Sequence, residues 1–231
     1  MKRMLIIPFV LSLLAGSAVA NPACTTVKLN QYISNNGTLG SACQIGNLLF
    51  YDFSFTVNTG SAITASQVTV TPETTALYSS DPVTNPGIRF SSMPITVGAG
   101  GTMDVTIDYV VATLSGSNLI DDYRLSNLTG SASNGWGTVA VSFDNTGQEL
   151  FGGIGNFSGT PVSHIVFSPF VNGVQVSTEI HVTKPSGSGL TSISIVQENF
   201  SEQIPEPYEA LLIGSGLVLL GLRRIRVKPR A

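Results

Sequence analysis

The sequence feature that most constrains the fold is a period-2 alternation of apolar and polar residues, which recurs between residues 26 and 200. Residues 103–109 show it simply, because Met, Val, Ile and Tyr alternate there with Asp, Thr and Asp. In residues 49–57 the same pattern predicts that five apolar side chains share one face: Leu49, Tyr51, Phe53, Phe55 and Val57. Since successive side chains of a strand point to opposite faces, such runs predict sheets with one buried and one solvated face.

The predicted strands are short, and they are separated by segments rich in Gly, Asn, Pro and Ser, which are typical of turns. The predicted loops include residues 115–118, 131–137, 152–159 and 186–189. No window of comparable length between the two chain ends combines a 3.6-residue period with helix caps. We therefore predict an all-β fold, a single antiparallel β-sandwich domain that is jelly-roll-like, over residues 21–203. Two domains are the less favoured alternative.

Residues 1–20 have the composition of a secretory signal peptide. Basic residues near the N-terminus precede an uncharged run over residues 5–14, and the segment ends in Ala18-Val19-Ala20. A basic start, a short apolar run and an Ala-x-Ala exit predict export, with cleavage before residue 21. A retained membrane anchor is the alternative.

Cys24 and Cys43 are the two cysteines of the chain. In an exported protein an even count predicts a disulfide, and here one pairing is possible. In the chain-entropy model, closing a loop of this size stabilises the fold by about 3 kcal/mol. The alternatives are a lipidated Cys24, which would have to be the first mature residue, and a metal site, which would need more ligands.

The C-terminal segment, residues 204–231, combines a proline step, a short apolar stretch and a basic end. Pro205-Glu206-Pro207 precedes the apolar residues 210–222, and Arg223, Arg224 and Arg226 follow. At 1.5 Å per residue this stretch reaches ~20 Å as a helix, which is less than the ~30 Å hydrocarbon core of a bilayer. It predicts a short transmembrane helix that acts as a temporary stop, with the arginines in the cytoplasm and the body outside. A permanent single-span anchor is the alternative.

This combination of motif, apolar stretch and arginines resembles the PEP-CTERM sorting domain. The resemblance covers residues 203–231 and implies that a membrane protease, exosortase, recognises the tail and cleaves it. Family members come from bacteria that make exopolysaccharide and have an outer membrane. Two features depart from the family pattern: Tyr208-Glu209 is more polar than usual, and residues 227–231 lengthen the tail. Residues 43–55 also resemble the start of uncharacterised PEP-CTERM proteins, for which no catalytic residues are established.

The predicted body is acidic and poor in charge. Of the 11 Lys and Arg residues, four lie in residues 21–203, against twelve of the 14 Asp and Glu residues. Nucleic-acid binding needs clustered basic side chains, so the charge pattern argues against that function.

Residues suited to catalysis are scattered through the body. His164 and His181 both lie in strand patterns, and no serine lies in a Gly-x-Ser-x-Gly elbow. Asp104 and Asp108 share a strand face but lie ~13 Å apart by strand rise, too far for the carboxylate pair of a glycosidase. We predict no catalytic residues and a protein that is not an enzyme.

No cofactor is predicted, and calcium is the weaker alternative. Calcium binds oxygen ligands, which two segments offer: Asn118, Asp121 and Asp122 in one, and Asp144 and Asn145 in the other. Neither segment has the Asp-x-Asp-x-Asp-Gly spacing of a dedicated calcium loop.

These features predict an exported surface or extracellular matrix protein, anchored in the membrane until its tail is processed and then associated with exopolysaccharide in a biofilm. Trp136, within Asn134-Gly135-Trp136-Gly137, is the candidate for stacking on a sugar ring. A tryptophan buried in the sandwich core is the favoured alternative. Two other functions stay open: a secreted glycan-active enzyme and a self-assembling surface-fibre subunit.

Overall fold

The computed structural model describes seven segments of the chain, which are residues 21–35, 41–60, 63–75, 85–114, 119–144, 146–155 and 164–203. The predicted signal peptide, residues 1–20, and the predicted sorting signal, residues 204–231, lie outside the described residues. Among the residues described, no helix has the length and apolar character needed to cross a bilayer.

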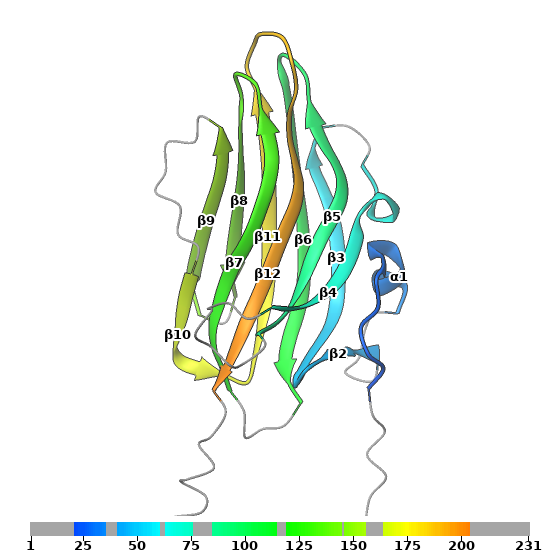
Figure 1. The fold of residues 1–231 in the computed structure, drawn as a ribbon, viewed down its shortest axis with the longest axis vertical. Coiled ribbons are helices and arrows are strands. Elements are labelled where there is room, and N and C mark those ends of the chain that lie inside the picture. Colours follow the sequence, from blue (N-terminus) through cyan, green and yellow to red (C-terminus); the bar gives the residue numbers. More distant parts are fainter. Residues whose placement is uncertain are drawn as a thin grey trace, which may run out of the picture.

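Strands dominate the described residues (Figure 1). The strands are β1 (Val27–Lys28), β2 (Cys43–Ile45), β3 (Leu48–Thr59), β4 (Thr69–Thr75), β5 (Asn85–Val97), β6 (Gly101–Thr113), β7 (Leu119–Ala132), β8 (Trp136–Phe143), β9 (Gln148–Gly155), β10 (His164–Val171), β11 (Gly173–Lys184) and β12 (Thr191–Gln203). The helices are α1 (Leu29–Ser34) and the 3-10 turn η2 (Ala65–Gln67). Helix α1 was not predicted, because its 6 residues are too few to show a helical period.

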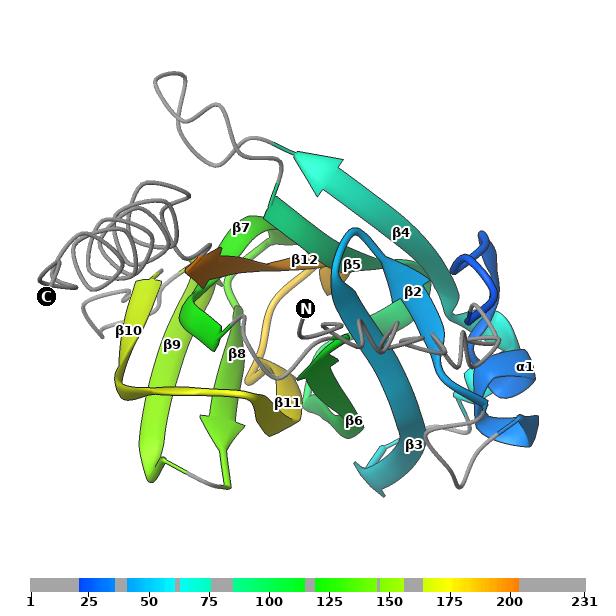
Figure 2. The ribbon, with the colours of Figure 1, turned by 90° about the horizontal axis from the view of Figure 1, so that it is seen from below.

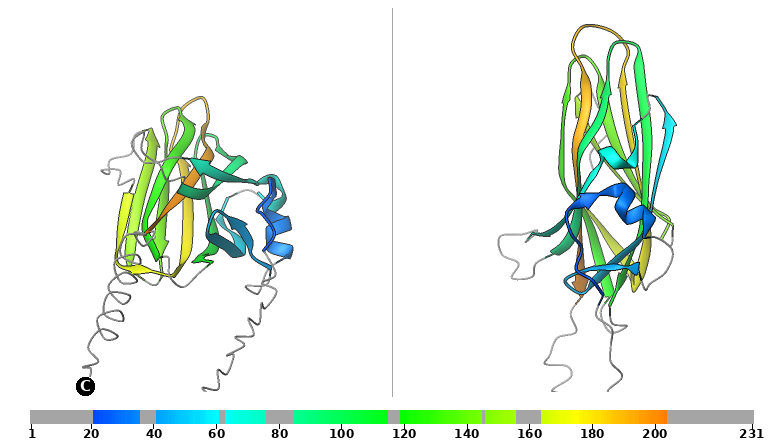
Figure 3. Two further views of the ribbon diagram at one scale, coloured as in Figure 1. Left: turned by 60° about the horizontal axis from the view of Figure 1, so that its bottom comes forward. Right: turned by 90° about the vertical axis from the view of Figure 1, so that its right-hand side faces the viewer.

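The strands form two six-stranded sheets with antiparallel pairing. One sheet has the order β1-β4-β5-β12-β7-β10, and the other has the order β2-β3-β6-β11-β8-β9. The two sheets face each other as layers, with α1 on one side and β9 and β10 on the other (Figures 2 and 3). The predicted all-β antiparallel sandwich is therefore confirmed.

The core lies between the two sheets and contains the side chains that the alternation predicts to be buried. In β6, the apolar residues at 103, 105, 107 and 109 are at most 2% exposed. At the centre, the Tyr109 ring lies 5.5 Å from the ring of Phe53 and 6.0 Å from that of Phe90, which belongs to the opposite sheet. Each large apolar side chain that is fully buried contributes about 1.5–3 kcal/mol to stability.

The prediction that the apolar side chains of residues 49–57 share one face is wrong for the residues before the middle of the segment. Tyr51 pairs with Val110, whereas Phe55 pairs with Ile107, and these two β6 residues point to opposite faces because they are three positions apart. A β-bulge between Tyr51 and Ser54 causes the change, and Asp52 within it has a φ of 57°. Such an insertion changes which face the following residues occupy, and a binary pattern does not reveal it.

Two predicted loops, residues 131–137 and 152–159, are partly strand. Two of their glycines lie within strands at points where the opposite layer comes close: a Cβ on Gly137 would lie 2.9 Å from Ile193 Cδ1, and one on Gly152 would lie 2.7 Å from Leu125 Cδ2. A glycine within a strand can mark a close approach of another layer rather than a turn. Composition alone therefore gave the wrong ends for these strands.

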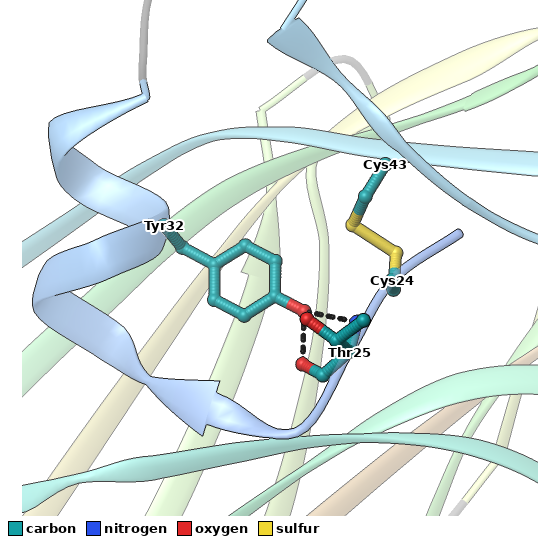
Figure 4. The surroundings of a disulfide bond; sticks show 4 residues. All are labelled: Cys24, Thr25, Tyr32 and Cys43. Atoms are coloured by element: carbon teal, nitrogen blue, oxygen red, sulfur yellow. Dashed lines mark hydrogen bonds between the residues drawn. A yellow bond between two sulfur atoms is a disulfide. The ribbon is translucent and has the colours of Figure 1, made fainter. Parts of the chain in front are cut away.

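The Cys24–Cys43 disulfide is present, as predicted, and it ties the start of the described chain to β2 (Figure 4). The Cα atoms of the two cysteines are 4.7 Å apart. Beside the disulfide, the Cys24 N–H donates to the Gln44 carbonyl at 3.0 Å, and the Gln44 N–H donates to the Pro22 carbonyl at 2.8 Å. The segment is therefore held by covalent and backbone bonds together.

Candidate functional site

The outer side of the second sheet carries a continuous polar surface, which we call the polar sheet face. It is formed by the outward side chains of β6, β11, β8 and β9, which are Asp104, Thr106, Asp108, Ser177, Glu179, His181, Trp136, Thr138, Ala140, Ser142, Glu149 and Phe151. All of them are half-buried or exposed, while the residues between them in the sequence are buried. Alternation thus places every one of these groups on a single face.

The strand register arranges this face in rows. Asp104, His181 and Thr138 form one row across β6, β11 and β8. Thr106, Glu179, Ala140 and Phe151 form the next row, which extends to β9. Neighbouring strands lie ~4.8 Å apart and neighbouring rows roughly 7 Å apart, so side chains within a row are in contact range.

Trp136 lies at the start of β8 on the polar sheet face, not in the sandwich core. Its ring stacks on the ring of His181, with centroids 5.0 Å apart and planes at 30°. The cross-strand partner of Trp136 on β9 is Gly155, which has no side chain to cover the indole. The core alternative for this residue is therefore wrong, although the structure does not test sugar binding.

The chain around Trp136 is fixed by a buried cation. Lys184, at the end of β11, is fully buried, and its Nζ donates to the carbonyl oxygens of Ser133 and, at 2.9 Å, of Ser188. These two carbonyls belong to the β7–β8 and β11–β12 connections, so Lys184 joins the two turns beside Trp136. The sequence pattern does not reveal this role of Lys184, because a buried and an exposed lysine occupy the same kind of position in a strand pattern.

His181 stands between Trp136 and two carboxylates. Its Nδ1 lies 3.8 Å from Asp104 Oδ2, and Asp104 Oδ1 also accepts a hydrogen bond from Asn58 Nδ2 at 3.4 Å. Burial, together with the charge and hydrogen bond of Asp104, raises the pKa of Glu179, while His181 opposes this shift. Glu179 and His181 lie on the same face of β11, and the register places Asp104 opposite His181.

Asp108 is held in place by two serines from the flanking strands. Ser54 Oγ donates to Asp108 Oδ2 at 2.8 Å, and Ser177 Oγ donates to Asp108 Oδ1 at 2.6 Å. Both carboxylate oxygens are thus engaged across β3, β6 and β11. Thr106 separates Asp108 from Asp104 along β6, so the two aspartates do not meet.

A hollow of about 180 Å³ opens in the polar sheet face beside this network. Small side chains, Ala140, Ser142 and Ser177, line part of it. The larger residues Glu149, Glu179 and Phe151 complete its wall, and Phe151 is 41% exposed. The hollow therefore offers hydroxyls, carboxylates and an aromatic ring at one place.

The second histidine belongs to the other sheet. His164 Nε2, on β10, lies 3.1 Å from Asp122 Oδ2 on β7. Burial, followed by the nearby charge of Asp122, raises the pKa of Asp121. His164 and His181 are therefore in separate settings.

The described residues contain no group of three or more His, Cys, Asp or Glu side chains that could hold a metal ion. Two of the five residues considered for calcium, Asn118 and Asn145, lie outside the described segments. The sorting residues Pro205, Glu206 and Pro207, the cleavage residues Ala18 and Ala20, and the arginines of the tail lie outside them as well.

The core contains a buried carboxyl group that the sequence did not predict. Glu198 on β12 is fully buried, where it accepts hydrogen bonds from the hydroxyls of Tyr109 and, at 2.8 Å, of Thr178, both on the opposite sheet. Burial raises its pKa to about 7, although the hydroxyls of Tyr109, Thr178 and Tyr123 counteract the shift. No local pattern reveals such a group, because its partners are distant in the sequence.

No protein-family model and no curated protein matches the chain. Among solved structures, the chain is similar to TmCBM61, which was determined in complex with β-1,4-galactotriose. The match has 9% sequence identity and a TM-score of 0.28, and it covers 66% of this chain and 88% of that one. A likeness of this size assigns no ligand to this chain.

Proposed function

We propose that residues 21–203 form a non-enzymatic glycan-binding body, which holds exopolysaccharide on the polar sheet face. The observation that carries this proposal is the Trp136 ring, stacked on His181 at the edge of a face lined by carboxylates and hydroxyls. Sugar rings present both an apolar C–H surface and several hydroxyls. A site with an aromatic ring beside hydrogen-bonding side chains complements both.

The rows of the face suit an extended ligand. Trp136 and Ala140 lie four positions apart on β8, which corresponds to roughly 13 Å along the strand. Phe151 is the cross-strand partner of Ala140, so two aromatic groups mark the ends of a track along β8 and β9. His181 and Glu179 lie beside this track on the neighbouring strand β11, and Asp104 lies one strand further, on β6. The carboxylates accept hydrogen bonds from sugar hydroxyls, and Thr138 can donate or accept.

The arrangement of the carboxyl groups favours binding over hydrolysis. Burial and the nearby Asp104 carboxylate raise the pKa of Glu179. Glycosidases need their two carboxyl groups about 5 Å apart or more, on opposite sides of the scissile bond. Asp104 and Glu179 project from neighbouring strands on one face, so they do not stand on opposite sides of a bound sugar, which supports a binding role.

The proposed function also includes export of the chain and processing of its C-terminal tail. We propose that residues 1–20 direct export, that residues 204–231 act as a PEP-CTERM sorting signal, and that an exosortase-type protease removes this tail. The protein would sit in the membrane before processing and at the cell surface or in the matrix afterwards. The Cys24–Cys43 disulfide supports this location, because such bonds persist in oxidising compartments.

The strand order supports a jelly roll as the finer description of the fold. The eight strands from β5 to β12 form two facing groups, β5-β12-β7-β10 and β6-β11-β8-β9. Eight antiparallel strands in two sheets are typical of that architecture.

Binding is tested with Trp136→Ala in the exported protein, by co-sedimentation with exopolysaccharide from the producing cells. We expect the variant to bind at least about tenfold more weakly, a loss of ~1.4 kcal/mol, because the stacking surface is gone. Phe170→Ala is the matched control, since Phe170 is an aromatic residue that is 39% exposed on the other sheet. A folded Trp136→Ala protein with unchanged binding would refute the proposed site, and release of shortened sugars by the parent protein would refute a non-enzymatic role.

A further inference from the structure

A cavity of about 330 Å³ lies beside the disulfide, away from the polar sheet face. The start of the described chain, α1, β2 and β3 provide its lining, which includes Gln31, Tyr32, Asn35, Tyr51 and Asp52. In the sheet, β6 and β11 separate β3 from Trp136 and Phe151 on β8 and β9. The volume is within the range of ~300–1,000 Å³ found for small-molecule sites.

The wall of this cavity is held firmly. The Tyr32 hydroxyl accepts a hydrogen bond from the Thr25 N–H at 3.1 Å and donates one to the Thr25 carbonyl at 2.6 Å (Figure 4). Its ring packs 4.9 Å from the ring of Phe53, which also lines the cavity. The Cys24–Cys43 disulfide fixes the adjacent segment. A cavity with these fixed walls needs little reorganisation to bind a ligand.

Asp52 gives the cavity its charge. It lies in the β3 bulge with a φ of 57°, in the left-handed region that few residues other than glycine adopt. Asp and Asn tolerate this conformation better than other side chains. A bulge often serves to redirect a side chain at a functional site, and here it sets an exposed carboxylate at the cavity wall.

The lining indicates the kind of ligand. The described residues that line the cavity include no Lys, Arg or His, so an anionic ligand would meet only Asp52 and no balancing charge. Gln31 and Asn35 both donate and accept hydrogen bonds, a carboxylate accepts from hydroxyls, and Tyr51 offers an aromatic surface. A neutral polyhydroxylated molecule satisfies all of these groups.

We propose that this cavity is a second binding site, which takes a neutral saccharide of one or two rings. The cavity uses none of the side chains of the polar sheet face. This proposal can therefore be correct whether or not the polar sheet face binds a glycan. The polar sheet face would hold a polymer along its length, and the cavity would hold a short saccharide.

Isothermal titration calorimetry of the exported protein with neutral disaccharides of glucose, galactose, mannose and xylose tests this proposal. We expect at least one disaccharide to bind, and Asp52→Asn to weaken that binding at least about tenfold. Asn tolerates the left-handed backbone at this position, so the variant changes the charge without straining the bulge. Asp144→Asn is the matched control, because Asp144 is an exposed carboxylate in the turn after β8, outside both sites. We expect it to bind as the parent does.

Trp136→Ala distinguishes the two sites. Disaccharide binding that persists in Trp136→Ala and falls in Asp52→Asn supports the cavity. Disaccharide binding that falls in Trp136→Ala and not in Asp52→Asn would overturn the cavity proposal. The proposed site on the polar sheet face would remain supported. The absence of any disaccharide binding, or a preference for a uronic-acid disaccharide, would also overturn the cavity proposal. Co-sedimentation with polysaccharide would still test the proposed site on the polar sheet face.

Discussion

Glu198 is a single core residue that makes the stability of the protein depend on pH. Its carboxyl group lies between the two sheets, where the hydroxyls of Tyr109 and Thr178 donate to it. Burial is the main cause that raises its pKa from 4.5 to about 7. The same burial, with the nearby carboxylate, raises the pKa of Tyr109 and Tyr123 as well, so all three groups are most stable in their protonated form.

The raised pKa predicts a loss of stability as pH rises. The unfolded chain releases the Glu198 proton near pH 4.5, whereas the folded protein keeps it until about pH 7. The stabilisation is therefore fully present below pH 4.5 and is lost as pH rises from 4.5 to about 7. A shift from 4.5 to about 7 corresponds to roughly 3 kcal/mol. We expect Glu198→Gln to remove this decline, which denaturant titrations at a series of pH values measure.

Glu149→Gln is the control for this experiment, because Glu149 is an exposed glutamate on the polar sheet face. It should keep the decline of the parent protein. A Glu198→Gln protein whose free energy of unfolding falls with pH as steeply as that of the parent would contradict the prediction.

At the scale of the elements, glycine decides how closely neighbouring strands approach. Gly87 in β5 faces β12, and a Cβ at this position would lie 2.1 Å from the Glu198 carbonyl oxygen and 2.8 Å from Asn199 Cα. These are backbone atoms, so no side-chain rotation relieves the contact. Composition marks Gly87 only as a weak strand residue, because the reason for it is on another strand.

We therefore predict that Gly87→Ala separates β5 from β12 and destabilises the protein by about 1–3 kcal/mol or more. Gly98→Ala is the matched control, since nothing lies within 4 Å of the added Cβ and its φ is not positive. The midpoints of urea unfolding measure both effects. Equal midpoints for the two variants would show that the sheet accommodates the extra methyl group.

At the scale of the molecule, the two ends of the described chain lie at the same end of the sandwich (Figure 1). Trp136 lies toward the opposite end, because a Cβ on the preceding Gly135 would lie 2.3 Å from Thr191 Oγ1, where β12 begins. β12 then runs roughly 40 Å to Gln203. Under the proposed sorting, a tail attached after Gln203 holds one end near the membrane and presents Trp136 outward.

The sorting proposal predicts a processed C-terminus. We expect the intact mass of protein recovered from outside the cell to correspond to a chain that begins at Asn21 and has lost the residues after the Pro205-Glu206-Pro207 motif. Replacement of this motif by three alanines should retain the full tail, because the extended proline step would no longer be presented to the protease. Secreted parent protein that still ends in Ala231 would contradict the proposal.

The strand content, the buried residues of β6 and the disulfide were predictable from the sequence alone. Alternation is a property of neighbouring residues, so it identifies which side chains of one strand share a face. The pairing of Cys24 with Cys43 followed from a count of two in a chain predicted to be exported. Both predictions need no knowledge of which strands lie side by side.

The candidate sites could not be predicted from the sequence, because tertiary structure brings their residues together. Trp136 meets His181 because β8 pairs with β11, and Glu198 meets Tyr109 because the two sheets face each other. The Asp52 bulge reverses the face of part of β3, which a two-letter pattern of apolar and polar residues does not encode. These contacts join residues far apart in the chain, and their formation depends on register and sheet packing, which no local periodicity specifies.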